Sequence, residues 1–320
     1  MKYAIGVDLG GTNIAVGLVD VEHRKILHRQ SVKTCAPRSC EAIVKDICDL
    51  VGSVCAHCGI PLSEISWIGI GTPGIVKNGT VFSASNLGWN KEPLSEYIEK
   101  ELGHPCYAAN DANAAALAEA LWGIGREDRS LVAITLGTGV GGGIVIDGEI
   151  WGGGNGCAAE IGCVIVNAET RENLEYSCSA TALIREGKRM MALHRDSLMW
   201  RLCGGDITKV SAKTVFDAAE QNDFAAKSVV DRFLIYLSVG IANVINVFQP
   251  DVVCIGGGIS QRGEALLVPL RKLVDSMAVG LPSEKTRLEI AAFQNDAGII
   301  GAALLGMQAK RAFHKDSKKQ

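Results

Sequence analysis

The chain has 320 residues, of which 48% are hydrophobic and 21% charged, and its formal net charge at pH 7 is −3. This length suits two domains with substantial buried cores, and the ordinary charged fraction argues against disorder outside the ends. A weakly negative charge gives no electrostatic basis for nucleic acid or an anionic membrane as the main partner, so we expect neither. The first predicted strand starts at Tyr3, which leaves no room for a secretory signal peptide, and we therefore expect a cytoplasmic protein.

Apolar periodicity over the first third of the chain predicts a small α/β lobe at 1–115. Its predicted elements are, in order, strands 3–8, 13–20 and 25–33, helix 40–58, strand 67–71, helix 93–102, strand 106–109 and helix 112–121. The last helix is rich in alanine, which is the best helix former. The lobe boundary is expected near the start of this helix.

A larger α/β lobe is predicted at 116–297. Its predicted elements are a hairpin at 131–150, helices near 180–195, 211–221 and 224–248, a strand at 251–255, a helix after Gly258, and a strand near 287–293. A final helix at about 298–313 is expected to pack back on the first lobe, with 314–320 as a frayed polar tail. The apolar run 233–249 is short for a membrane span and contains two asparagines, so we interpret it as a buried helix.

The chain contains eleven cysteines, and a cytosolic setting predicts that they are reduced and mostly buried. Cys55 and Cys58 form a lone C-x-x-C with no second pair at zinc-ligand spacing. We interpret these two as thiols on one helix face.

Two segments combine a short apolar strand, a glycine turn and a second strand. The first turn, Gly10-Gly11-Thr12, follows strand 3–8, and the second, Gly137-Thr138-Gly139, follows the strand 131–135. Glycine turns let backbone N–H groups approach a phosphate closely, and threonine hydroxyls add donors. Two such hairpins predict two similarly built halves around one phosphorylated ligand.

The second turn also fits the dinucleotide pattern G-x-G-x-x-G, but that pattern requires a helix after the glycines. The residues that follow, Ile144-Val145-Ile146, are β-branched and predict a strand. No G-x-x-x-x-G-K-[ST] segment exists, which excludes a P-loop enzyme. The remaining interpretation is a nucleotide held by its phosphates between two lobes.

Two aspartates are candidates for the chemistry. Asp8 ends a buried strand beside the first glycine turn, where it would hold magnesium directly or through water; the alternative is a turn aspartate that accepts backbone N–H groups. Asp111 lies where a strand meets a helix, and its alternative role is to cap that helix or stabilise its dipole. Because Asn110 can supply the cap, Asp111 is predicted to accept the proton of a substrate hydroxyl during phosphoryl transfer.

The ordered motifs of this chain resemble the ROK family of sugar kinases, within the actin/hexokinase-like fold. The matching segments span nearly the whole chain: Val7–Asn13, Gly71–Gly74, Ser85–Trp89, Asn110–Ala116, Thr135–Gly143, Ala159–Gly162 and Ile255–Gly258. The resemblance implies a two-lobed α/β fold with a ribonuclease H-like core in each lobe and the active site in the cleft between them. It is closest to the ATP-dependent glucokinases of that family.

The resemblance also implies roles for individual residues, with Asp111 as the catalytic base. The implied sugar ligands are Gly71, Asn86, Asn110, Asp111, Glu160 and Glu175. The implied ATP contacts are Asp8, Gly10, Gly11, Thr12, Asn13, Thr138 and Gly139 at the phosphates and Gly257 and Gly258 at the adenosine, with Mg²⁺ near Asp8. A homodimer is expected.

One departure from the family pattern affects the sugar site. The family has Glu-x-Gly-His, whose histidine binds sugar and zinc, and then a cysteine cluster; this chain has Cys163 after Gly162, and Val164–Ser177 contains no cysteine. We expect no zinc, the alternative being an altered thiolate site of Cys157, Cys163 and Cys178. Because cysteine is a weak hydrogen-bonding group, discrimination at that end of the sugar should be looser.

The leading hypothesis is ATP-dependent phosphorylation of glucose to glucose 6-phosphate. A second is a kinase for N-acetylmannosamine, fructose or allose. A third is a sugar-sensing regulator, although the family's repressors have a DNA-binding domain before the first hairpin and here that hairpin starts at Tyr3. A fourth is a sugar-binding protein that has lost catalysis.

Overall fold

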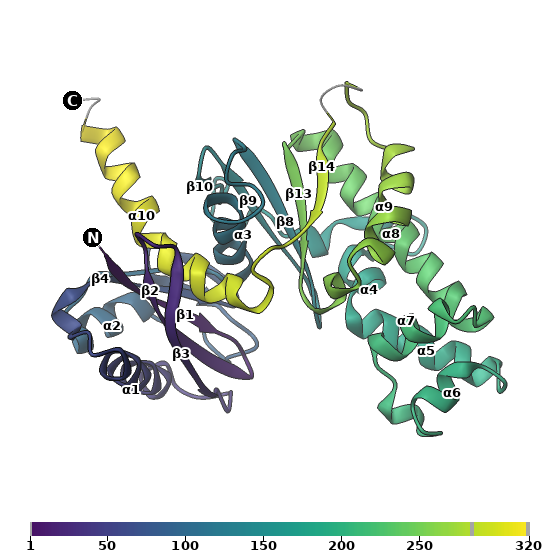
Figure 1. The fold of residues 1–320 in the computed structure, drawn as a ribbon, viewed down its shortest axis with the longest axis horizontal. Coiled ribbons are helices and arrows are strands. Elements are labelled where there is room, and N and C mark those ends of the chain that lie inside the picture. The colour runs from purple at the N-terminus through teal and green to yellow at the C-terminus, as the bar shows by residue number, and fades with distance from the viewer. Residues whose placement is uncertain (1, 282–284, 318–320) are drawn as a thin grey trace. The chain divides into compact units, whose positions relative to one another are not determined.

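A computed structural model describes residues 2–281 and 285–317 of the chain (Figure 1). The chain forms two compact units: Met1–Ala133 with Gly143–Ala159 and Ala292–Gln320, and Ile134–Gly142 with Glu160–Ala291. The lobe boundary that the sequence predicts at 115/116 stays a prediction.

The first unit is built on a five-stranded sheet in the order β3-β2-β1-β4-β7. Its strands are β1 (Tyr3–Leu9), β2 (Asn13–Asp20), β3 (Lys25–Lys33), β4 (Ile65–Thr72) and β7 (Cys106–Asn110). The first three are antiparallel neighbours, whereas β1, β4 and β7 run parallel. A two-stranded hairpin of β5 (Ile75–Lys77) and β6 (Thr80–Ser83) follows β4. Parallel strands place their carboxyl ends at one edge of the sheet, which is the usual edge for ligands in α/β folds.

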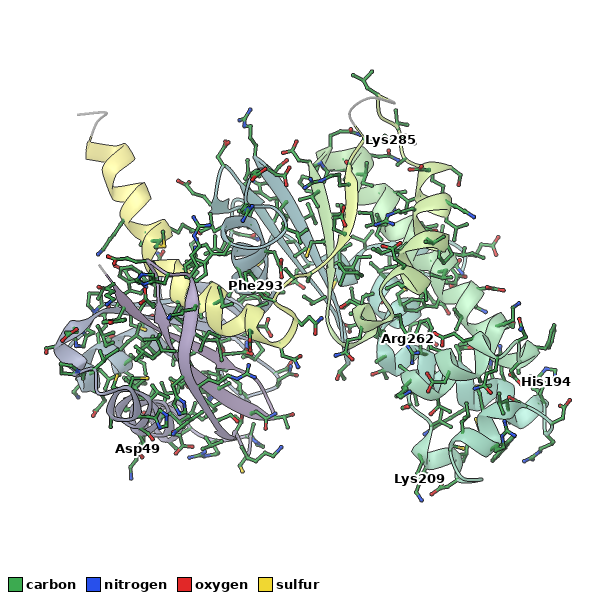
Figure 2. The ribbon with its side chains drawn as sticks, in the orientation of Figure 1. Asp49, His194, Lys209, Arg262, Lys285 and Phe293 are labelled. Carbon is green, nitrogen blue, oxygen red and sulfur yellow. The ribbon has the colours of Figure 1, made fainter. Side chains whose placement is uncertain are left out.

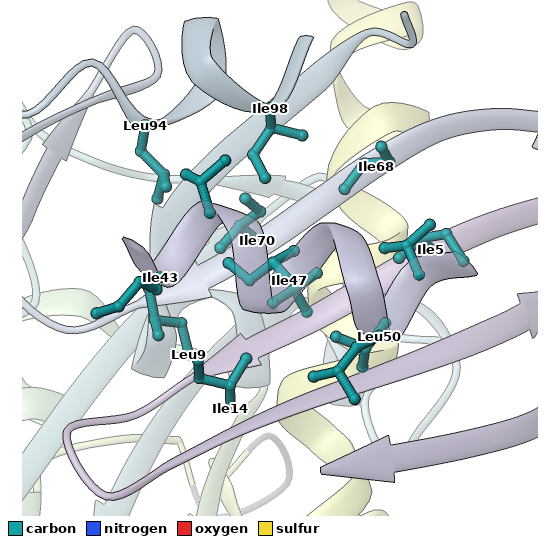
Figure 3. Close-up of a cluster of buried hydrophobic side chains, with 14 of the residues drawn as sticks. Ile5, Leu9, Ile14, Ile43, Ile47, Leu50, Ile68, Ile70, Leu94 and Ile98 are labelled. Carbon is teal, nitrogen blue, oxygen red and sulfur yellow. The ribbon is translucent and has the colours of Figure 1, made fainter. Parts of the chain in front are cut away.

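Helices cover both faces of this sheet. On one face, α1 (Cys40–Cys58) and α2 (Leu94–Leu102) bury isoleucines and leucines against β1, β2 and β4 (Figure 3). The helix α1 begins at its cap Ser39, whose side chain accepts the Ala42 N–H, and ends at Gly59 with φ 63°. Ser39 and Gly59 are the residue types that favour these two ends.

On the other face, α10 (Ala297–Ser317) packs on β1 and β4 and against α3 (Asp111–Leu121). The approach is so close that a Cβ at Gly69 would overlap the carbonyl oxygen of Ala302, and one at Gly301 would overlap that of Ala114. The C-terminal helix is therefore part of the first unit. It continues to Ser317, so residues 314–317 are helical where a tail was predicted, and 318–320 lie outside the described residues.

A second five-stranded sheet has the order β10-β9-β8-β13-β14. Its strands are β8 (Ser130–Leu136), β9 (Val140–Ile146), β10 (Glu149–Ile150), β13 (Val252–Gly256) and β14 (Arg287–Ile290). A small hairpin joins β11 (Ile165–Asn167) to β12 (Glu172–Asn173). The predicted strand after the second glycine turn is thus confirmed as β9.

Helices make up most of the second unit. They are α4 (Leu174–Cys178), α5 (Ala180–Leu193), α6 (Leu198–Leu202), α7 (Ala212–Glu220), α8 (Phe224–Phe248) and α9 (Glu264–Asp275). Short 3₁₀ helices lie at Ile161–Cys163, Ile207–Lys209 and Gly258–Arg262 in this unit, and at Leu62–Glu64 and Gln294–Asp296 in the first. Arg262, which is labelled in Figure 2, forms an ion pair with Asp217 of α7 at 2.8 Å.

The long apolar helix α8 is the one described helix long and apolar enough to cross a membrane. It packs against α4, α5, α7 and α9, and its buried residues recur at helical spacing. Such packing is typical of the core helix of a globular unit.

Candidate active site

The register of three parallel strands brings the predicted residues of the first unit to one sheet edge. Asp8 on β1 lies opposite Gly71 on β4, and Gly71 lies opposite Ala109 on β7. One residue further, Thr72 pairs with Asn110, after which α3 begins at Asp111. Residues far apart in the sequence therefore meet at the carboxyl ends of these strands.

Asp8 and Asp111 influence each other electrostatically. Burial raises the pKa of Asp8 to about 6, and the neighbouring Asp111 carboxylate contributes to that rise. Burial also raises the pKa of Asp111, although the Ala112 N–H, which donates to its Oδ1 at 2.8 Å, opposes the shift. Two carboxyl groups with raised pKa values at a strand edge are characteristic of a catalytic or metal-binding site.

Asn110 caps the helix α3, as the sequence predicted. Its Oδ1 accepts the N–H groups of Ala112 at 2.9 Å and Asn113 at 3.3 Å, and its Nδ2 donates to the carbonyl of Gly74 at 3.2 Å. Asp111 also accepts the Ala112 N–H, but it does not have to cap the helix alone. Its second carboxylate oxygen has capacity for a further partner.

The first glycine turn is held by bonds to its carbonyl groups. The N–H of Gly10 donates to Asn13 O at 2.9 Å, the Thr34 hydroxyl donates to Gly10 O at 2.6 Å, and the Thr34 N–H donates to Thr12 O at 2.9 Å. Asn86 lies against the turn, because a Cβ at Gly11 would be 3.2 Å from its Cβ. The structure thus brings Gly10, Gly11, Thr12, Asn13 and Asn86 together.

The second glycine turn, in the second unit, is held in a similar way. The Gly137 N–H donates to Gly139 O at 3.0 Å, the Ala180 N–H donates to Gly137 O at 2.8 Å, and the Thr181 hydroxyl donates to Thr138 O at 2.8 Å. Gly257, with φ 82°, passes so close to β8 that a Cβ there would lie 2.7 Å from the carbonyl carbon of Leu136. Thr138, Gly139 and Gly257 therefore belong to one neighbourhood, and Gly258 follows directly.

The predicted sugar ligand Glu175 contacts this turn. Its Oε2 accepts the N–H of Val140 at 2.9 Å. Burial raises the pKa of the Cys163 thiol, and the charges of the nearby Glu160 and Glu175 carboxylates raise it further. The second unit therefore gathers Glu160, Cys163 and Glu175 beside the turn. The sequence motifs indicated these residues but not the bond to Val140.

The cysteines show no arrangement for metal. Burial raises the pKa of the Cys178 thiol, which donates to Phe233 O at 3.5 Å, and burial also raises the pKa values of Cys55 and Cys58 on α1. Within 2–281 and 285–317, no three His, Cys, Asp or Glu side chains are grouped so as to hold a metal ion.

A cavity of about 490 Å³ lies in the first unit along the edge strand β7. Asn110, Asn113, Ser95 and Tyr107 line it together with two glutamates, and no Lys, Arg or His stands among its described lining residues. Buried Asn113 Oδ1 has no hydrogen-bond partner there. Neutral donors and acceptors with two carboxylates fit an uncharged hydroxylated molecule better than an anion. The Asn110–Ala116 motif contains Asn113, but its spacing did not single that residue out.

Residues 4–309 of the chain match the ROK family. The chain belongs to the ROK family. It is 39% identical over 312 residues to the glucokinase of Thermotoga maritima, covering 93% of this chain and 95% of that protein. It is 34% identical over 330 residues to the glucokinase of Halalkalibacterium halodurans, covering 99% and 98%.

A solved ROK structure extends the likeness to three dimensions. The ROK family glucokinase of Streptomyces griseus, solved in complex with glucose and AMPPNP, is 33% identical, with a TM-score of 0.80 over 95% of this chain and 98% of that one. The predicted actin/hexokinase-like α/β fold is thereby confirmed.

Proposed function

We propose that this protein is a sugar kinase that transfers the γ-phosphoryl group of ATP to the 6-hydroxyl of glucose, giving glucose 6-phosphate and ADP. The observation that carries the proposal is the pair Asp8 and Asp111 at the carboxyl ends of β1 and β7, in a chain whose full-length relatives include glucokinases. The S. griseus relative, with glucose and AMPPNP bound, supports this pair of substrates.

Asp111 is proposed as the general base. Its raised pKa makes the carboxylate a better proton acceptor than an exposed aspartate. Asn110 caps α3, so Asp111 is not needed for that role alone. In the transfer, Asp111 accepts the proton of the sugar hydroxyl while the hydroxyl oxygen forms a bond to the γ-phosphorus of ATP. The bond between the γ-phosphorus and the bridging oxygen of the β-phosphate breaks, which releases ADP. Asn110, Glu160, Gly71 and Asn86 are proposed to orient the sugar.

The two glycine turns are proposed to hold the ATP phosphates. Threonine hydroxyls and backbone amides bind the turn carbonyls at Gly10, Thr12, Gly137 and Thr138. These contacts hold the turns through their carbonyl groups, which pre-organises the N–H groups of the turns for an anion. Gly257 and Gly258 are proposed to lie against the adenosine.

Asp8 fits a magnesium ion. Mg²⁺ is usually held by one or two carboxylates together with substrate phosphates and waters, so it needs no cage of protein ligands. A carboxyl whose pKa is raised partly by a second carboxyl is stabilised when a cation neutralises both. Asp8 would hold the ion directly or through water, and the ion would neutralise charge on the phosphates.

Glucose is proposed as the substrate over N-acetylmannosamine, fructose or allose on the strength of the glucokinase relatives. The cavity beside Asn110, which amides, hydroxyls and two carboxylates line without any cationic side chain among its described residues, supports a neutral sugar as ligand. We further propose that the enzyme acts in the cytoplasm as a homodimer and uses no zinc.

Replacing Asp111 tests the proposal. Asp111→Asn keeps the shape of the side chain but removes its basicity, so kcat should fall by a factor of about 10³ while glucose and AMPPNP still bind. The matched control is Asp49→Asn, an exposed position on α1 (Figure 2), which should change kcat less than about twofold. An Asp111→Asn enzyme with more than a tenth of wild-type kcat would refute the assignment.

A further inference from the structure

Glu175 is held in position by the cap of its helix and by a hydrogen bond to β9. It stands in the first turn of α4, where the cap Asn173 accepts the N–H of Tyr176 at 2.8 Å. Its side chain is exposed, yet Oε2 accepts the N–H of Val140 at the start of β9, at 2.9 Å. A hydrogen bond between an amide and a carboxylate is stronger than one between neutral groups. Glu175 therefore links α4 to the second glycine turn.

Two glycines make this link sterically possible. A side chain at Gly139 would overlap the Glu175 carboxylate, and one at Gly162 would overlap the carbonyl oxygen of Val140. A Cβ at Gly162 would also lie 3.4 Å from the Cβ of Glu175. The turn, the Glu160–Cys163 segment and α4 thus pack together around one carboxylate.

The carboxylate of Glu175 has hydrogen-bonding capacity beyond its bond to Val140. A carboxylate accepts up to about four hydrogen bonds, so the bond to Val140 leaves capacity for another donor. A Cβ at Gly162 would lie 3.4 Å from the Cβ of Glu175, so Glu175 lies beside the short segment that carries Glu160, a residue proposed to bind sugar. One carboxylate is then shared between the proposed phosphate turn and the proposed sugar site.

We propose that Glu175 couples sugar binding to ATP binding by bridging the bound sugar and the second glycine turn. A sugar hydroxyl that donates to Glu175 would restrain the carboxylate, which in turn restrains Val140 and its neighbours Thr138 and Gly139. A turn already ordered by sugar costs less conformational entropy when the phosphates bind. Because coupling is reciprocal, ATP must raise sugar affinity by the same factor. This inference rests on the proposed function.

The experiment measures the Kd of AMPPNP by calorimetry with and without saturating glucose. For the wild type we expect glucose to tighten AMPPNP binding at least about fivefold. Glu175→Ala removes the bridge and should reduce that factor to less than about twofold. Glu175→Asp keeps the charge but is one methylene shorter, so it also should lose the coupling while still binding glucose. Glu175→Gln keeps an amide oxygen that can accept the Val140 N–H, so this variant should retain most of the coupling between glucose and AMPPNP.

Thr181→Val is the matched control, because it changes a contact of the same turn and leaves Glu175 in place. It removes the bond from the exposed Thr181 hydroxyl to Thr138 O, so AMPPNP affinity should change little and by the same factor with and without glucose, and the coupling factor should stay at the wild-type value. Wild-type coupling in both Glu175→Ala and Glu175→Asp would overturn the inference, as would a wild type that binds both ligands independently. A wild type that does not bind AMPPNP at all would instead refute the proposed function.

Discussion

The two glycine hairpins are built alike but acquire their acidic residue differently. In each, a threonine from another element donates its hydroxyl to a carbonyl of the turn: Thr34 to Gly10 in the first and Thr181 to Thr138 in the second. The first hairpin carries Asp8 on its own strand, whereas the second receives Glu175 from a helix 35 residues away in the sequence.

This difference separates two roles for a carboxylate near phosphates. Asp8 is half-buried, its pKa is raised to about 6, and it lies with Asp111 at the sheet edge, which suits a cation. Glu175 is exposed and bound to a backbone amide, which suits a link between turn and sugar. Two glycine turns built alike can therefore have acidic residues with different roles.

Among changes to the two hairpins, the largest effect is expected at the second turn. Gly139→Ala places a methyl group where the Glu175 carboxylate lies, so either the turn or the acid must move. Overpacking of this kind costs about 1–3 kcal/mol, and kcat/KM for ATP should fall about 10- to 100-fold. Steady-state kinetics at saturating glucose measure this value.

Two alanine variants serve as controls for that change. Nothing lies within 4 Å of a Cβ at Gly137, and the Cβ at Gly11 in the first hairpin would be 3.2 Å from that of Asn86. We expect Gly137→Ala to act weakly and Gly11→Ala to act between the two. Equal losses for Gly137→Ala and Gly139→Ala would show that the Glu175 contact is irrelevant.

The burial of Asp8 predicts that stability depends on pH. Its pKa of about 6 in the folded protein exceeds the ordinary value of 3.8, so the folded state holds the proton more tightly and the unfolding free energy falls as pH rises from about 4 to 6. Asp8→Asn cannot ionise, so its stability relative to wild type should increase by about 2 kcal/mol between pH 4 and pH 7. Urea unfolding at both pH values measures the change.

The control for this titration is again Asp49→Asn, which should follow the wild-type curve. A constant difference between Asp8→Asn and wild type across this range would contradict the buried ionisable pair. Activity of Asp8→Asn should be low at every pH if Asp8 holds the cation.

The smallest effects are expected at the two threonines. Thr34 is fully buried, so Thr34→Val leaves the Gly10 carbonyl without its donor and should cost about 1–2 kcal/mol of stability. Thr181 is exposed, so water can replace its hydroxyl and Thr181→Val should cost less than about 0.5 kcal/mol. Thermal unfolding measures the loss of stability in each variant. A larger loss for Thr181→Val than for Thr34→Val would contradict the burial of Thr34 and the exposure of Thr181.

Much of this fold was predictable because local signals agreed with the tertiary structure. The helix α1 has the predicted bounds, since Ser39 and Gly59 mark its ends and the apolar residues between them keep helical spacing. The five-residue helices α4 and α6 were missed because such short segments contain too few residues to show a period. The bond from Val140 to Glu175 joins residues distant in sequence, and no local pattern reports it.

The most direct test of the central claim is the reaction itself. Purified protein with ATP and Mg²⁺ is given glucose, N-acetylmannosamine, fructose or allose, and ADP and sugar phosphate are quantified together. We predict equal amounts of ADP and glucose 6-phosphate, the fastest turnover with glucose, and little ATP hydrolysis without sugar. Absence of ATP consumption with every sugar would contradict the assignment of this chain as a sugar kinase.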